Sequence, residues 1–300
     1  MRETEIKWSV VGHEKQKEFL KNALLSDRVS QFYLLVGPDN VGKTSLAIDF
    51  SKAIKCYREA VKPVVPCQKC EICRSFRASA DHFLLDSVEE IKIDDIRLLK
   101  KRFAFAANRD GHKTAVIGNA QNLNREAANA FLKLLEEPAG ATTFLFALPS
   151  LGWLPQTIVS RGQKVIFTLN TEKDFQNFIK QQNIAATKTQ QALALRRIGL
   201  LKRILEDEDQ YLSYSRIRDL DRLSETPGLE FLNQIMSLHD VDSQQLRILF
   251  TYWLLLENEK TPDTLLKNSL KKSQAIAQGL EMLTFNANKK LVLDSIAVSI

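Results

Sequence analysis

A nine-residue stretch of the chain, GPDNVGKTS, has the composition and spacing of a phosphate-binding loop, G-x-x-x-x-G-K-[ST]. It follows the apolar run Phe32–Val36 and leads into a segment with helical spacing. In such a loop, successive backbone N–H groups surround phosphate oxygens, and the following helix adds its positive N-terminus. The predicted nucleotide-binding residues are therefore Gly37, Pro38, Asp39, Asn40, Val41, Gly42, Lys43, Thr44 and Ser45.

Three residues of this loop have individual roles. The Lys43 amine is expected to reach the β- and γ-phosphates, and the Thr44 hydroxyl to bind Mg²⁺. Asn40 stands where many such loops carry an additional glycine, and asparagine tolerates the left-handed conformation required there. We therefore expect the chain to bind ATP with Mg²⁺.

Hydrolysis requires acidic side chains as well as the loop. A carboxylate at the end of a neighbouring strand holds the Mg²⁺ shell, and a second polar group positions the attacking water. The run Thr114–Ile117 is the best candidate strand, but Gly118-Asn119-Ala120-Gln121 follows it. Amides do not neutralise a divalent cation or accept a proton near neutral pH, so ATP hydrolysis by this chain is not expected. The alternative is a carboxylate from another strand, and Asp86 is the comparable strand-end acid.

The four cysteines of the chain form a second candidate site. Cys56, Cys67, Cys70 and Cys73 follow the pattern C-x10-C-x2-C-x2-C. Four thiolates with two close C-x2-C steps suit a tetrahedral structural zinc site. A disulfide pair is disfavoured in a reducing cytoplasm, and an iron–sulfur cluster lacks the expected downstream Cys-Pro. The prediction is structural zinc bound by residues 56–73.

Hydrophobic periodicity indicates the elements that position these residues. Strand-like runs at Phe32–Val36, Thr114–Ile117, Thr143–Leu148 and Lys164–Phe167 alternate with helical patterns, which predicts an α/β fold with a parallel sheet covered on both faces. The remainder reads as helical, and Thr171 is a predicted helix cap. We expect a nucleotide-binding domain at 1–168, a small helical lid at 169–208 and an all-helical collar domain at 209–300.

Composition narrows the class of protein. Hydrophobic content of 44% and charged content of 26% are ordinary for a globular chain. No apolar run approaches the ~20 residues of a membrane span, and the N-terminus lacks the apolar core of a secretion signal, so a cytoplasmic location is expected. A net charge of +6 is a weak indicator of nucleic-acid binding. His13, His82, His112 and His239 lack metal-ligand spacing and are expected on the surface or in loops.

Together these segments resemble the bacterial clamp-loader AAA+ subunits. The resemblance begins with residues 10–47 and continues through the four-cysteine insert. It includes four further segments with family-like sequences, Ile91–Phe103, Asn124–Pro138, Thr157–Gly162 and Thr284–Asp294. The order and spacing of these segments make the resemblance specific.

The resemblance implies a role for Arg161, which lies in TIVSRG where the family has an S-R-C motif. It would be an arginine finger that reaches the γ-phosphate of ATP on a neighbouring subunit. The sequence departs from the family's ATPases at three places. Their D-E-A-(D/E/H) motif is replaced by Gly118–Gln121, their polar sensor corresponds approximately to Leu148, and Gly162 replaces the cysteine of S-R-C. A basic sensor is expected in the lid, at Lys202 or Arg203.

The resemblance also implies partners. They are the other clamp-loader subunits (gamma/tau and delta), arranged in a hetero-oligomeric ring through the collar, the sliding clamp, and primer-template DNA. The departures favour a stator that supports ATP-dependent clamp loading without turnover of its own. One alternative is an active ATPase of the gamma/tau type. Another is a separate zinc-dependent nucleic-acid binder, which salt-sensitive DNA binding without partners would favour.

Overall fold

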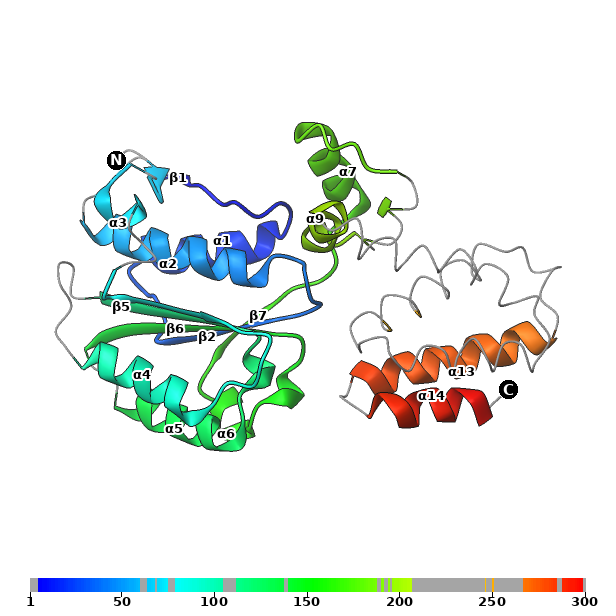
Figure 1. The fold of residues 1–300 in the computed structure, drawn as a ribbon. Helices are drawn as coiled ribbons and strands as arrows, with labels where there is room; N and C mark the ends of the chain where they lie inside the picture. The colour runs from blue at the N-terminus through cyan, green and yellow to red at the C-terminus, as the bar shows by residue number, and fades with distance from the viewer. Residues whose placement is uncertain are drawn as a thin grey trace. The chain divides into compact units, whose positions relative to one another are not determined.

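The ribbon of the protein is shown in Figure 1. The computed structural model describes residues 5–59, 64–67, 69–74, 79–104, 112–137, 140–187, 190–191, 194, 196–206, 246, 250, 267–284 and 288–298. The chain forms two compact units. The first consists of Met1–Ala185 with Arg196–Leu200, and the second of Ala186–Leu195 with Leu201–Ile300. The predicted boundaries at residues 168 and 208 stay predictions.

A five-stranded parallel sheet organises the first unit, which confirms the predicted α/β class. Its strand order is β4-β5-β6-β2-β7, and every neighbouring pair is parallel. The strands are β2 (Phe32–Val36), β4 (His82–Asp86), β5 (His112–Gly118), β6 (Ala141–Leu148) and β7 (Gln163–Ile166). A separate parallel pair joins β1 (Glu5–Ile6) to β3 (Val64–Val65).

Helices cover both faces of the sheet (Figure 1). One face carries α1 (Glu14–Leu25) and α2 (Lys43–Glu59); the other carries α4 (Ile93–Phe103), α5 (Arg125–Glu136) and α6 (Gln156–Val159). Because side chains alternate along a strand, Phe32 and Leu34 join the core beneath α4 and α5, whereas Tyr33 and Leu35 join the core beneath α1 and α2. Burial on both faces explains why these strands are continuously apolar.

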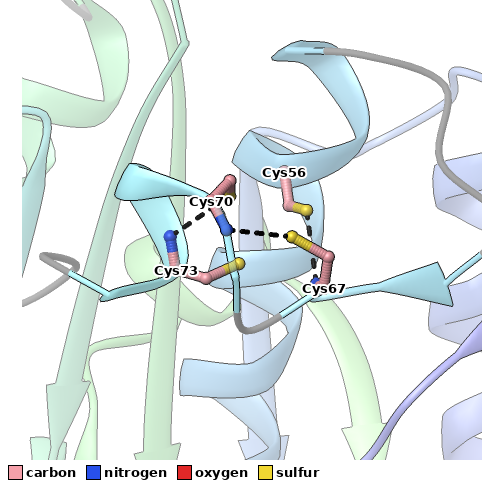
Figure 2. Close-up of side chains that lie close together, drawn as sticks. All are labelled: Cys56, Cys67, Cys70 and Cys73. Atoms are coloured by element: carbon pink, nitrogen blue, oxygen red, sulfur yellow. Dashed lines mark hydrogen bonds between the residues drawn. The ribbon is translucent and has the colours of Figure 1, made fainter.

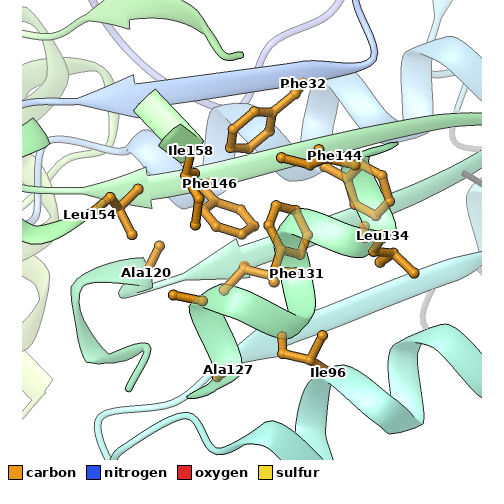
Figure 3. Packing of buried hydrophobic residues seen from close by; sticks show 14 of the residues in the cluster. Phe32, Ile96, Ala120, Ala127, Phe131, Leu134, Phe144, Phe146, Leu154 and Ile158 are labelled. Carbon is orange, nitrogen blue, oxygen red and sulfur yellow. The ribbon is translucent and has the colours of Figure 1, made fainter. Parts of the chain in front are cut away.

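Aromatic side chains fill the core on the α5 side of the sheet (Figure 3). Phe131 of α5 lies with its ring centroid 4.4 Å from Phe146 and 5.1 Å from Phe144, both on β6. Asn124 begins α5 by accepting a hydrogen bond from the Ala127 N–H at 2.8 Å. This packing fixes the segments that follow β5 and β6, where the hydrolytic groups of an ATPase would lie.

The predicted cap at Thr171 is present, because its Oγ1 accepts a hydrogen bond from the Asp174 N–H at 3.1 Å. It begins α7 (Glu172–Gln181), and α9 (Ile198–Glu206) follows. In the predicted collar, the structure describes Leu246, Phe250, α13 (Lys267–Thr284) and α14 (Lys289–Val298). The last two helices pack closely, since a Cβ at Gly279 would lie 2.4 Å from Ile296. None of the described helices is long and apolar enough to span a bilayer.

Candidate functional site

The phosphate loop connects the end of β2 to the start of α2, as predicted. Gly37 and Gly42 have φ angles of 153° and 103°, and a Cβ at Gly37 would lie 2.3 Å from the Phe167 carbonyl oxygen. A side chain at either position would therefore distort the loop. Asn40 has a φ of 62°, the left-handed conformation expected for it.

Four hydrogen bonds fix the loop to surrounding elements. At its start, the Gly37 N–H donates to the Leu148 carbonyl at 3.2 Å, and the Phe167 N–H donates to the Val36 carbonyl at 2.6 Å. Further along, the Asn40 carbonyl accepts from the Gly199 N–H at 2.9 Å, and the Val41 carbonyl lies 3.1 Å from His13 Nε2. The loop is thus held by the ends of two strands, by the start of α1 and by the start of α9.

Lys43 points back into the loop. Its Nζ donates to the carbonyls of Gly37 and Pro38, each at 2.7 Å, and lies 3.6 Å from the Asp39 carboxylate. Burial lowers the pKa of Lys43 from 10.5 to about 8, although Asp39 acts to raise it, and Arg197 adds to the lowering. An ammonium group held among loop carbonyls is placed to exchange them for phosphate oxygens.

The two residues after Lys43 lie in the first turn of α2. Thr44 is half-buried and Ser45 is exposed. The Thr44 hydroxyl is the candidate Mg²⁺ ligand of the loop. Val41 is buried and contributes its carbonyl rather than its side chain. The nine predicted residues therefore form a loop over Gly37–Gly42 and the first turn of α2 over Lys43–Ser45, with Lys43 and Thr44 as the candidate functional side chains.

Non-acidic residues occupy the positions of the hydrolytic groups. Gly118 ends β5, Asn119 follows in the left-handed conformation with a φ of 52°, and Leu148 ends β6 with 1% of its surface exposed. Asp86, an acid at the end of β4, pairs with Gly118 in the sheet register. A Cβ on Gly118 would lie 2.1 Å from Asp86 Oδ1, so the Asp86 carboxylate leans over the end of β5.

Arg161 lies at the opposite end of the sheet from the phosphate loop. It precedes β7, where Gln163 pairs with Tyr33, whereas the loop begins only after Val36. At ~3.3 Å per residue, the level of Gln163 is about 13 Å along the strand direction from Gly37, and Arg161 lies in the turn that precedes Gln163. Its guanidinium pairs with Glu136 at 2.9 Å, and both side chains are about half exposed. Arg161 is therefore unsuited to contact a nucleotide on its own loop.

The four cysteines come together as predicted (Figure 2). Cys56 belongs to α2, Cys67 follows β3, and Cys70 and Cys73 lie at α3 (Glu71–Arg74). Their sulfur atoms all lie within 4.8 Å of one another, and no disulfide joins these four residues. Zn–S bonds of ~2.3 Å place tetrahedral sulfurs about 3.8 Å apart, so a small inward adjustment would accommodate zinc.

Backbone N–H groups point at the sulfurs. The N–H of Cys67 donates to Cys56 Sγ, that of Cys70 to Cys67 Sγ, and that of Cys73 to Cys70 Sγ, at 3.3–3.5 Å. Although burial acts to raise the pKa of Cys67, the N–H groups of Cys70 and Lys69 lower it to about 6. Burial raises the pKa of Cys56 to about 11. A thiolate that already receives N–H donors is a suitable zinc ligand.

The expectation for the histidines was partly wrong. His82 and His112 are 1% and 5% exposed because they are the first residues of the buried strands β4 and β5. Each ring lies 3.0 Å from a threonine hydroxyl on the neighbouring strand. His13 lies at the start of α1 against the loop, and His239 lies outside the described residues. A histidine that opens a buried strand has no distinctive spacing, so the sequence contained no signal for this burial.

The contact between α9 and the loop was also missed. Lys202 and Arg203, the predicted lid sensors, are exposed. Instead, Gly199 touches Asn40, and a Cβ at Gly199 would lie 2.7 Å from the Asn40 oxygen. A glycine that permits such a close backbone approach was the available signal.

Comparisons with known proteins identify the family. The sequence profile described as DNA polymerase III, delta subunit, matches residues 12–171. The DNA polymerase III subunit tau of Bacillus subtilis (strain 168) is 35% identical over 160 residues, 53% of this chain and 28% of that protein. Subunit tau of Escherichia coli (strain K12) is 32% identical over 211 residues, 68% of this chain and 32% of that protein. The chain thus spans about a third or less of the length of these relatives.

Solved structures agree on the fold. A mutant of RuvB from Thermotoga maritima superposes with a TM-score of 0.50 at 17% identity, covering 84% of this chain and 90% of that one. At this identity the likeness shows a shared fold of sheet and helices. The profile match covers more than half of the chain and includes the phosphate loop, the cysteine cluster and Arg161. The chain therefore belongs to the DNA polymerase III delta subunit family of clamp-loader AAA+ proteins.

Proposed function

We propose that the chain is the delta-prime subunit of a bacterial DNA polymerase III clamp loader. In this role it is a cytoplasmic AAA+ stator in a ring with gamma/tau and delta subunits. It binds ATP with Mg²⁺ without hydrolysing it, carries a structural zinc ion on the four cysteines, and supports loading of the sliding clamp onto primed DNA. The observation that carries the proposal is the intact phosphate loop beside Gly118, Asn119 and Leu148, where an ATPase has charged or polar groups.

We also propose that Arg161 is an arginine finger that reaches the nucleotide of a neighbouring ATPase subunit, and its position supports this role. Because the start of β7, which Arg161 precedes, is about 13 Å along the strand direction from its own loop, the proposed contact of its guanidinium is with a nucleotide on another subunit. The pair with Glu136 is half exposed, and pairs of this kind stabilise a protein by 0–1 kcal/mol at most, so a phosphate oxygen can displace Glu136 at little cost. An arginine finger supplied in trans typically accelerates phosphoryl transfer by ~10³–10⁵.

Reconstitution with the other loader subunits tests this role. Arg161→Ala should leave the assembly intact and reduce hydrolysis at the neighbouring site by roughly 10³ or more. Glu136→Gln is the matched control: it breaks the same ion pair but keeps the finger, so hydrolysis and clamp loading should be preserved. If both variants behave alike, the ion pair within the chain is the role of Arg161 and the finger assignment fails.

The second candidate function is an active clamp-loader ATPase of the gamma/tau type. It is favoured by the names of the relatives, which are tau subunits at 32–35% identity. The residues at the ends of β5 and β6 argue against it. Lys43-dependent ATP turnover by the purified chain would establish it in place of the stator.

A further inference from the structure

Asp86 and Gly118 share one space at the end of the sheet. They are register partners on β4 and β5, so their side-chain positions lie on the same face. A Cβ added to Gly118 would lie 2.1 Å from Asp86 Oδ1, 2.6 Å from Asp86 Cγ and 3.2 Å from Asp86 Cβ. The oxygens of an aspartate lie at about 2.4 Å from its own Cβ. The Asp86 carboxylate thus occupies the space that an acidic side chain on β5 would use.

An amide relay orients this carboxylate. Asn119 donates from Nδ2 to Asp86 Oδ1 at 3.0 Å, and Asn119 Oδ1 accepts from Gln121 Nε2 at 3.3 Å. Because the first bond uses the amide as a donor and the second uses it as an acceptor, the two bonds together define which way the Asn119 amide points. Asn119 has a left-handed backbone, with a φ of 52°, and its side chain reaches back to Asp86 at the end of β4. The replacement of acids by amides at 119 and 121 is therefore compatible with holding an acid that comes from β4.

The location suits a cation bound together with a nucleotide. In a parallel sheet the carboxyl ends of all strands meet at one edge, and β5 lies two strands from β2, which leads into the phosphate loop. The Asp86 carboxylate comes from β4 but lies over the end of β5, so about two strand spacings, roughly 10 Å, separate it from β2. A carboxylate, a hydrated Mg²⁺ and the Thr44 hydroxyl can together span this gap. Mg²⁺ keeps several waters and is typically bound through one or two carboxylates plus phosphates.

We propose that Asp86 supplies, from the neighbouring strand, the magnesium-binding carboxylate that β5 lacks at Gly118. The site would take Mg²⁺ with the phosphates of a bound nucleoside triphosphate, so the inference rests on the proposed nucleotide binding. The Asp86 carboxylate would add Mg²⁺ binding but not ATP hydrolysis, because Asn119 and Leu148 offer no group that can accept a proton from water. Gly118 is then a requirement of the site, since any larger residue displaces the Asp86 carboxylate.

Nucleotide titrations with and without Mg²⁺ test the proposal. In the native chain, Mg²⁺ should tighten ATP binding; Asp86→Asn should reduce that gain by about tenfold, the value of one charge-assisted contact. ATP binding in EDTA should be unchanged in this variant. Glu89→Gln is the matched control because it removes a carboxylate that is also exposed, three residues further along the chain, and it should retain the gain.

A second variant separates the placement of the carboxylate from its charge. Gly118→Ala keeps Asp86 but forces its carboxylate away, so it should lose the Mg²⁺ gain to a similar extent while circular dichroism shows an intact fold. Mn²⁺ bound with ATP gives the same comparison by electron paramagnetic resonance.

The outcomes are distinct. A Mg²⁺ gain that survives in both Asp86→Asn and Gly118→Ala overturns the proposal. If Glu89→Gln also loses the Mg²⁺ gain, the effect of Asp86 is one of general surface charge, and the proposal is again overturned. A native chain that binds ATP neither with nor without Mg²⁺ contradicts the proposed nucleotide binding itself, and the magnesium site falls with it.

Discussion

Even a methyl group at Gly162, the residue after the proposed arginine finger, should destabilise the fold. The clamp-loader subunits that the sequence resembles have a cysteine at this position, but in this chain buried side chains of the sheet fill the space for a Cβ. A Cβ at Gly162 would lie 2.5 Å from Leu34 Cδ1, 2.6 Å from Leu34 Cγ and 3.2 Å from Phe32 Cδ1. Both neighbours are fully buried in the sheet, so they cannot turn into solvent to relieve the contact.

The size of the effect follows from two opposing terms. Overpacking a close-packed core by one methyl group costs about 1–3 kcal/mol. Replacing glycine by alanine reduces the entropy of the unfolded chain, which offsets about 0.4–1 kcal/mol. Gly162→Ala should therefore lower the free energy of unfolding by about 1.3 kcal/mol, the difference between the middles of the two ranges, and by no more than about 2.6 kcal/mol. Gly152→Ala is the matched control, because the nearest atom to a Cβ there is Ser150 Oγ at 3.9 Å, and its effect should stay within about 0.5 kcal/mol.

Urea unfolding of a double-mutant cycle is the assay. Leu34→Ala alone should cost about 2–5 kcal/mol by opening a cavity beneath Gly162. In Gly162→Ala/Leu34→Ala the added methyl group fills part of that cavity, so the double variant should be more stable than the sum of the single effects by at least about 0.5 kcal/mol. Strict additivity, or a Gly162→Ala variant as stable as the native chain, would refute the packing argument.

Three further predictions concern the metal cluster, the phosphate lysine and the α9 contact. The purified chain should hold one zinc ion per molecule, measured by atomic emission, and Cys70→Ser should lose it; a full zinc content in Cys70→Ser would contradict the ligand set. The pKa of Lys43 is about 8 in the folded state and 10.5 ordinarily, so between these pH values the unfolded chain binds a proton that the folded chain does not. The native chain should therefore gain up to about 3 kcal/mol of stability relative to Lys43→Met as the pH rises from 8 to 10.5. A stability difference that stays constant over this pH range in denaturation experiments would show that folding does not lower the pKa of Lys43. Gly199→Ala should break the hydrogen bond to the Asn40 carbonyl and weaken ATP binding about threefold to tenfold in a calorimetric titration, whereas Glu206→Gln, an exposed change in the same helix, should leave the affinity unaltered.

The fold and the location of both candidate sites were predictable because their signals are local. The run Phe32–Val36 is apolar throughout since both faces of β2 are covered, and the glycines of the loop follow directly. The cysteine spacing predicted the cluster, which the four sulfurs form. The Thr171 cap was predictable for the same reason, because a cap depends on residues three positions apart.

Contacts between distant segments were not predictable in this way. Asp86 and Gly118 are thirty-two positions apart, and only the pairing of β4 with β5 places the carboxylate over the glycine. The approach of Gly199 to Asn40 depends on the path of the chain after α7. The burial of His82 and His112 depends on which strands occupy the sheet, and their composition gives no indication of it.

Phosphate release by the purified chain tests the central claim most directly. The measurement compares the native protein with Lys43→Ala, at saturating ATP and across a range of Mg²⁺ concentrations, so that contaminating activity appears equally in both. We predict no release above the Lys43→Ala background, because a loop that binds ATP beside Gly118, Asn119 and Leu148 has no group to activate water. Multiple turnovers that require Lys43 would contradict the account and assign the chain to the hydrolysing subunits of its family.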